Sequence, residues 1–139
     1  MRDLAYCILR GVNFDPIRTM ILTNLILEDP TVKEDLDPIT KQPWGFGEAS
    51  ISQGKHIHKK EEDISLEELL DVLVKYYPVM KQCGLEEIML TLVVYYSAAK
   101  DKFDYALSPS IFKKIRMLGD DVHLGIDWYS LSTDDEVSH

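Results

Sequence analysis

The spacing of apolar residues along the chain changes between the two-residue period of strands and the longer period of helices. The run from Leu4 to Val12 is apolar on both faces and predicts a strand. Directly behind it, Asp15 is suited to cap a helix and Pro16 to occupy its first turn, because the N–H that proline lacks has no intrahelical partner there. We expect this helix to end at residues 28–30 and to turn four residues at helical spacing toward the core: Ile17, Met20, Ile21 and Leu25.

The clearest helix begins at Ser65, which forms a capping box with Glu68. Six apolar residues then recur on one side of it: Leu66, Leu69, Leu70, Leu73, Tyr77 and Met80. Pro78 lacks an N–H and its ring crowds the preceding turn, which predicts a kink or a restart there. The helix should stop near Gly84.

The remaining elements are shorter. Residues 48–57 alternate weakly and predict an edge strand, whereas residues 87–97 are apolar on both faces and predict an interior strand. Residues 103–107 should pair with it as a hairpin. Ser108 caps a third helix that stops at Gly119, and residues 122–129 form the last strand.

The predicted order is β-α-β-α-β-β-α-β within a single domain of residues 1–132, followed by a frayed acidic tail at 133–139. Because helices are fewer than strands and two strands are adjacent, this order is typical of an α+β fold. We expect a mixed or antiparallel sheet of about four to five strands with helices packed on one face.

Residues 30–47 are rich in proline and glycine and predict a long irregular loop. Three acids lie in it, Glu34, Asp35 and Asp37, and Trp44 follows them. Trp44 either packs inward or forms part of a contact surface.

The chain of 139 residues carries 24 acidic against 15 basic side chains, a net charge of −9. This balance opposes binding to nucleic acid and to anionic membranes, and it favours encounter with a basic protein as well as plain solubility. No run approaches the length of a membrane span, and Asp3 lies where an export signal requires positive charge, so we expect a cytoplasmic protein. Cys7 and Cys83 lie in apolar runs and should be buried free thiols.

Candidate chemistry is sparse. His56 and His58 form an H-x-H pair followed by acids, a weak metal-binding pattern that the interleaved lysines oppose. Asp127 lies between apolar residues in the last strand, where a carboxyl is either half-buried or turned outward. No nucleotide-binding or nucleophile motif is present, so the sequence favours a non-enzymatic protein without a cofactor.

A set of short motifs follows one another in a recognisable order from Leu4 to Tyr129: Gly11-x-x-Phe14-Asp15-Pro16, Pro30-Thr31, the leucine-rich helix from Leu66 to Leu73, Leu107-Ser108-Pro109 and Ile126-Asp127-Trp128-Tyr129. In this order the chain resembles the bacterial domain-of-unknown-function group 4279, apart from residues 32–43, which look like an insertion. That group has no established catalytic residues. The resemblance implies a small acidic protein similar to the immunity proteins of bacterial toxin–immunity pairs.

The favoured hypothesis is therefore an immunity protein that neutralises a cognate, basic toxin, such as a nuclease, by direct binding. Glu34, Asp35, Asp37 and Trp44 are its candidate contact residues. Two alternatives stay open: a small metal-dependent hydrolase that uses His56 and His58, and a homo-oligomeric structural protein held by a sheet edge.

Overall fold

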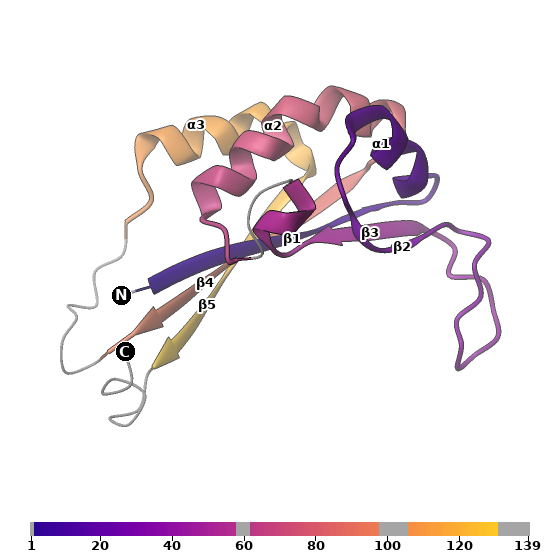
Figure 1. Ribbon diagram of the computed structural model, residues 1–139, viewed down its shortest axis with the longest axis horizontal. Coiled ribbons are helices and arrows are strands. Elements are labelled where there is room, and N and C mark those ends of the chain that lie inside the picture. Colours follow the sequence, from indigo (N-terminus) through magenta and orange to yellow (C-terminus); the bar gives the residue numbers. More distant parts are fainter. Residues whose placement is uncertain (1, 58–61, 98–105, 131–139) are drawn as a thin grey trace.

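The computed structural model describes residues 2–57, 62–97 and 106–130, and within these residues the chain forms one mixed sheet of five strands and three helices. In chain order the elements are β1 (Arg2–Gly11), α1 (Pro16–Thr23), β2 (Glu28–Thr31), β3 (Gly47–Ile51), the 3-10 turn η1 (Gly54–Ile57), α2 (Leu66–Gln82), β4 (Glu87–Tyr96), α3 (Pro109–Met117), the 3-10 turn η2 (Gly119–Asp121) and β5 (Val122–Ser130). The helices lie on one face of the sheet (Figure 1). The predicted α+β class, with a mixed sheet and helices on one face, is confirmed.

β1 lies at the centre of the sheet, whose strand order is β2-β3-β1-β4-β5. It pairs antiparallel with β3 and β4, so that Cys7 lies between Ile51 and Leu90. β4 pairs in parallel with β5, and the connection that a parallel pair requires contains α3. The interior position of β4 confirms what its two apolar faces predict. β3, in contrast, is an inner strand and not the predicted edge strand.

The edge beside β3 is formed by β2, a strand that the hydrophobic pattern does not predict. Pro30 lies in it, and a sheet edge tolerates proline because no N–H is needed there. α1 ends before the predicted residues 28–30, because Asn24 adopts a left-handed conformation with φ of 63° and its N–H bonds to the Met20 carbonyl.

Two predicted segments fall outside the described residues: most of the strand at 103–107, and the tail at 133–139. Ala106 and Leu107 are described and do not lie in a strand. Both sides of β4 are paired, one with β1 and the other with β5.

The core lies between the sheet and the helices. Alternate residues of β1, Ala5, Cys7 and Leu9, are fully buried. The predicted stripe of α2 faces them, with these residues buried: Leu66, Leu69, Leu70, Leu73 and Met80. Both cysteines are free and buried, as predicted, and burial raises the pKa of the Cys7 thiol to about 12.

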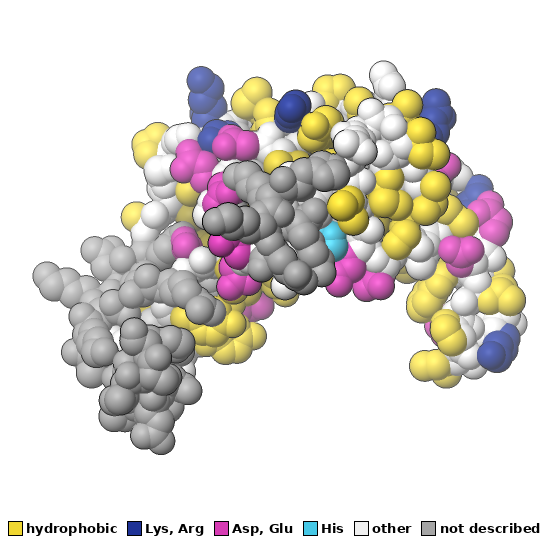
Figure 2. All heavy atoms as spheres, in the orientation of Figure 1, with side chains coloured by type: hydrophobic (Ala, Val, Ile, Leu, Met, Phe, Trp, Pro, Cys, Tyr) yellow, Lys and Arg dark blue, Asp and Glu magenta, His cyan; other side chains and the backbone are white. Residues whose placement is uncertain are grey.

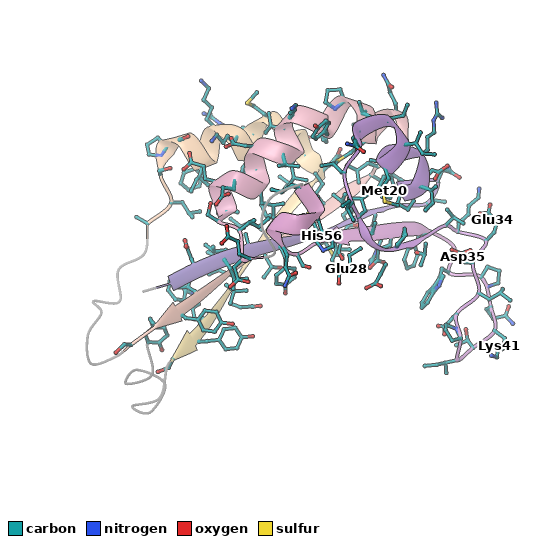
Figure 3. The ribbon with its side chains drawn as sticks, viewed as in Figure 1. Met20, Glu28, Glu34, Asp35, Lys41 and His56 are labelled. Atoms are coloured by element: carbon teal, nitrogen blue, oxygen red, sulfur yellow. The ribbon has the colours of Figure 1, made fainter. Side chains whose placement is uncertain are left out.

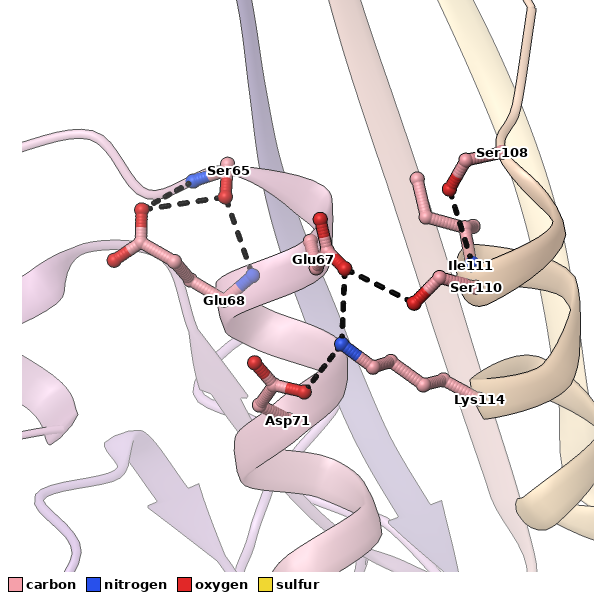
Figure 4. Close-up of polar contacts among 8 residues, drawn as sticks. All are labelled: Ser65, Glu67, Glu68, Asp71, Ser108, Ser110, Ile111 and Lys114. Carbon is pink, nitrogen blue, oxygen red and sulfur yellow. Dashed lines mark hydrogen bonds and ion pairs between the residues drawn. The ribbon is translucent and has the colours of Figure 1, made fainter.

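α2 begins at the predicted capping box (Figure 4). Ser65 Oγ accepts a hydrogen bond from the Glu68 N–H at 3.2 Å, and the Glu68 carboxylate accepts one from the Ser65 N–H at 3.5 Å. The helix continues through Pro78 to Gln82, so no restart occurs at the proline.

α3 is joined to α2 by exposed polar contacts (Figure 4). Lys114 Nζ lies 2.7 Å from the Asp71 carboxylate and 3.0 Å from that of Glu67. Hydrogen bonds to Asp71 and Glu67 raise the pKa of Lys114, and the bond from Lys114 lowers the pKa of Glu67. These contacts fix how α3 lies along α2.

α1 packs with the side opposite to the predicted one. Thr19 and Thr23 are buried, and their hydroxyls donate hydrogen bonds of 3.0 Å and 2.7 Å to the carbonyls of Asp15 and Thr19. Buried threonines are therefore satisfied within the helix. Ile17 and Ile21, predicted as core residues, are 48% and 77% exposed.

The reason for this reversal lies on either side of the helix. Phe14 precedes α1, and Leu25 and Leu27 follow it; all three belong to the buried core. They fill the space against the sheet, so that small side chains suffice beneath the helix itself. Of the four predicted core residues, Leu25 is buried and Met20 packs against the core.

Candidate functional site

Residues 32–46, which we call the arm, extend from the end of the sheet away from the helices (Figure 1). Three main-chain hydrogen bonds join the two sides of the arm: Gly45 N–H to the Lys33 carbonyl at 3.0 Å, Trp44 N–H to the Asp35 carbonyl at 2.8 Å, and Asp37 N–H to the Gln42 carbonyl at 2.8 Å. The segment predicted to be an irregular loop is therefore an ordered hairpin-like projection.

The three acids predicted to contact a partner differ in their surroundings; Figure 3 labels two of them, Glu34 and Asp35, on the arm. Asp35 accepts a hydrogen bond from the Val32 N–H at 2.9 Å, and Asp37 accepts one from the Ile39 N–H at 2.7 Å. Both carboxylates thus stabilise turns of the arm itself. Glu34 is exposed at the base of the arm, where it lines a pocket. The three acids therefore differ: Asp35 and Asp37 hold turns of the arm, and Glu34 lines the pocket.

Trp44 connects the arm to the sheet. Its ring lies 6.3 Å from that of Phe46, and the Arg10 guanidinium lies over the Phe46 ring at 4.6 Å. Arg10 also donates a hydrogen bond of 3.0 Å to Glu48. Trp44 remains 37% exposed. It therefore packs against Phe46 at the base of the arm and still presents part of its ring at the surface.

Apolar side chains project from the outer part of the arm. Leu36 is 58% exposed, and Ile39, near the tip, is 90% exposed. The side chains of Leu36 and Ile39 contribute nothing to the core, although the arm that carries them is held by hydrogen bonds. Figure 2 shows hydrophobic side chains on the arm and over α1.

A second group of exposed apolar side chains lies on and beside α1, and we call it the α1 surface: Val12, Ile17, Ile21, Leu22 and Ile26. It is a consequence of the reversed packing of the helix. Single exposed apolar residues are ordinary, but a group on one element is typical of a contact site.

A pocket of about 190 Å³ lies between the α1 surface and the arm, lined by residues 12–15 and 32–34. Across it, Lys33 Nζ donates a hydrogen bond of 2.8 Å to Asn13 Oδ1. The base of the arm is thus tied to the start of α1. We call the α1 surface and the arm together the α1–arm surface.

The turn between β1 and α1 has a structural role. A side chain at Gly47 would place its Cβ 1.9 Å from the Phe14 carbonyl oxygen, and one at Gly11 would lie 2.2 Å from that of Gly84. Asp15 caps α1 by accepting a hydrogen bond from the Arg18 N–H at 3.0 Å, as predicted. The glycines permit three segments of main chain to meet at this turn.

The histidine pair is only partly described. His56 lies in η1, not in a strand, and is 4% exposed, with Nε2 3.2 Å from Glu28 Oε2 (Figure 3). Ser52 donates a hydrogen bond of 2.6 Å to the same oxygen. His58 lies outside the described residues. Among the described residues no three histidine, cysteine or acidic side chains are grouped as metal ligands would be.

Asp127, the other titratable candidate, is exposed on β5. The outward orientation is thus the correct one of the two that the sequence left open. No helix in the described part of the chain combines the length and the apolarity needed to cross a membrane.

Comparisons with family models, with curated proteins and with solved structures gave no significant match.

The α1 surface is the part of the site that the hydrophobic pattern misses. A period of 3.6 residues shows that a helix has an apolar side, but not that this side faces the core. The sequence does contain one signal of the other packing. A second set of residues follows helical spacing on the side of α1 opposite Ile17 and Ile21, and the structure buries all of it: Pro16, Thr19 and Thr23. Phe14, Leu25 and Leu27 nearby supply enough apolar volume to make this alternative packing possible.

Proposed function

We propose that this chain is a protein-binding module that contacts a basic partner through the α1–arm surface, as an immunity protein contacts its toxin. The observation that carries the proposal is the exposure of apolar side chains on two elements that are tied together, Ile17 and Ile21 on α1 and Leu36 and Ile39 on the arm. The resemblance to immunity proteins supports the class of partner.

The order of the arm favours binding. Its main-chain hydrogen bonds and the contact between Lys33 and Asn13 hold the exposed side chains in place before a partner arrives. A surface that is ordered in advance loses less conformational entropy when it binds. Leu36 and Ile39 can therefore act as apolar anchors at the centre of an interface.

Charge supplies the second part of the proposal. Two acids, Asp15 and Glu34, and one base, Lys33, line the pocket between the two apolar groups, and the whole chain has a net charge of −9. A field of this sign accelerates encounter with a basic protein at low salt. Asp35 and Asp37 add negative charge, although their carboxylates are also needed to hold the arm together.

The test compares capture of partners from the native cell by three tagged forms of the full chain. The double variant Ile21→Lys with Ile39→Lys places charge on the α1–arm surface. The control, Met117→Lys, changes an apolar residue on α3 that is 56% exposed. A protein retained by the wild type and by the control, and lost with the double variant, supports the proposal; equal capture by all three forms contradicts it.

A second measurement addresses charge with the captured partner. Glu34→Lys should slow association and weaken its dependence on salt, since surface charge acts mainly on the association rate. Asp35→Asn and Asp37→Asn are preferable to reversals at those residues, because an amide oxygen still accepts the hydrogen bond that holds each turn. Association rates of all variants equal to the wild type at low salt would contradict the role assigned to these acids.

A further inference from the structure

The buried imidazole of His56 is not a member of the α1–arm surface. It lies in η1 and is 4% exposed, and within the described residues neither of its ring nitrogens has a hydrogen-bond partner. Buried polar atoms in native proteins nearly always have such partners, so an exception calls for a reason. The position of the ring relative to Glu28 provides one.

Glu28 is the acidic group that faces this imidazole (Figure 3). His56 Nε2 lies 3.2 Å from Glu28 Oε2, which is within ion-pair distance but without the alignment of a hydrogen bond. Ser52 donates a hydrogen bond of 2.6 Å to the same oxygen and so holds the carboxylate in position. The Glu28 side chain is 42% exposed, so an ion pair formed here avoids the full desolvation cost of a buried pair.

We call these three residues the His56 cluster, and it joins three segments of the chain. β2 contributes Glu28, the segment after β3 contributes Ser52, and η1 contributes His56. The His56 carbonyl also accepts a hydrogen bond of 2.9 Å from the N–H of Ile26, two residues before β2. The His56 N–H donates to the Gln53 carbonyl at 3.2 Å, which is an uncharged contact. Within the described residues, Glu28 is therefore the acid on which a charge at the imidazole would act.

β2 is a strand with few main-chain constraints. It has 4 residues, one of which is Pro30, and its pairing with β3 shifts register between Glu28 and Thr31. The arm begins at the next residue, Val32. The contact with His56 thus lies at one end of a short edge strand, and the arm lies at the other end.

We infer that His56 forms a proton-dependent contact that links β2 to η1. A neutral imidazole carries one N–H and no charge, whereas a protonated one carries two N–H groups and a positive charge. Protonation therefore converts the approach to Glu28 into a charge-assisted hydrogen bond, which is roughly twice as strong as a neutral one. A histidine ordinarily changes its charge between about pH 5 and pH 8, where a glutamate stays ionised. β2 is thus held more tightly at the acidic end of this range than at the alkaline end.

Amide hydrogen exchange of the full chain, at about pH 5 and about pH 8, tests the inference. Protection factors remove the intrinsic effect of pH on the exchange rate. In the wild type, the Ile26 N–H should be protected at least about threefold more strongly at the lower pH, because its acceptor belongs to His56. The Leu118 N–H, which bonds to the Ile115 carbonyl in α3, should be protected equally at both pH values.

Three variants identify the residues responsible. Glu28→Gln removes the charge and keeps the shape of the side chain, so the pH effect at Ile26 should be lost. Asp29→Asn is the matched control and should keep the effect: it removes the same charge from the next, exposed residue of β2, and asparagine tolerates the left-handed backbone there, where φ is 50°. His56→Gln should also lose the effect. Circular dichroism reports whether each variant folds, and the half-exposed Glu28 provides a decisive variant even where His56→Gln fails to fold.

Three results would overturn the inference: equal protection of Ile26 at both pH values in the wild type, an undiminished pH effect in Glu28→Gln, or loss of the effect in Asp29→Asn as well. A consequence for partner binding through the arm rests on the proposed function. Because exchange is measured on the protein without a partner, failure of the contact and failure of the capture experiment are observed separately.

Discussion

Lys33, at the base of the arm, donates a hydrogen bond from Nζ to Oδ1 of Asn13, 2.8 Å away in the turn that precedes α1. The two residues are 20 positions apart in the sequence, and their contact crosses the pocket between the two halves of the α1–arm surface. It therefore couples the orientation of the arm to that of α1.

Replacing Asn13 by alanine should loosen the arm without unfolding the protein. The lost hydrogen bond is exposed, so the free energy of unfolding should fall by less than about 1 kcal/mol. The Trp44 and Gly45 amides, which bond across the arm, should exchange with deuterium several-fold faster. Arg18→Ala, on the exposed side of α1, is the control. Unchanged exchange in Asn13→Ala would show that the arm is held by its own hydrogen bonds alone.

Gly47 should be intolerant of any side chain. Its Cβ would lie 1.9 Å from the Phe14 carbonyl oxygen, so main chain must move in Gly47→Ala. We expect a loss of at least about 2 kcal/mol in urea unfolding, the scale of overpacking in a core. Gly125→Ala is the matched control, because nothing lies within 4 Å of its added Cβ. Equal stability of the two variants would mean that the turn adapts easily.

The reversed packing of α1 is tested by a pair of substitutions. Ile21→Gln alters a side chain that is 77% exposed and should change the free energy of unfolding by no more than about 0.5 kcal/mol. Leu25→Ala, at a residue that is 5% exposed, should cost about 2–5 kcal/mol. If Ile21→Gln proves as costly as Leu25→Ala, α1 packs as its apolar spacing alone predicts.

Local signals in the sequence were sufficient for much of the fold. The capping box at Ser65 and the leucine spacing of α2 involve neighbours in the chain, and they predict both the start of the helix and its buried side. The two apolar faces of β4 likewise predict an interior strand. Asp15 with Pro16 gives the start of α1.

Features that depend on distant residues were not predictable in the same way. The buried side of α1 depends on how Phe14, Leu25 and Leu27 fill the core. β2 exists because β3 offers it hydrogen bonds, although Pro30 argues locally against a strand. In the arm, Asp35 and Asp37 were predicted as contact residues from their charge alone, whereas their hydrogen bonds to main chain are visible only in three dimensions.

Tyr77 and Asp121 link α2 to the turn before β5 and should make stability depend on pH at both extremes. The Tyr77 hydroxyl donates a hydrogen bond to the Asp121 carboxylate, and Lys81 Nζ lies 2.9 Å from the same carboxylate. The bonds from Tyr77 and Lys81 lower the pKa of Asp121. The contribution of the Asp121 carboxylate to the stability of the folded state is therefore complete above the ordinary pKa of an aspartate. It is lost as the pH falls through the lowered pKa of Asp121.

At alkaline pH the dependence of stability on pH runs in the other direction, because stability is lost as the pH rises. Burial, followed by the bond to Asp121, raises the pKa of Tyr77 from 10.0 to about 12. The folded state keeps the Tyr77 proton to a higher pH than the unfolded state does. This difference stabilises the folded state fully below pH 10, and the stabilisation is lost as the pH rises toward 12. Tyr77→Phe should lower the free energy of unfolding at pH 7 by about 1 kcal/mol.

The deficit of Tyr77→Phe relative to the wild type should shrink between pH 10 and 12, where the wild type loses the contribution of the hydroxyl. Urea unfolding across this range measures the difference, and Tyr76→Phe, at the next residue of α2, controls for the loss of a phenol as such. A deficit that stays constant from pH 7 to pH 12 would show that protonation of Tyr77 is not coupled to folding, and that the hydroxyl contributes only through contacts that are independent of charge.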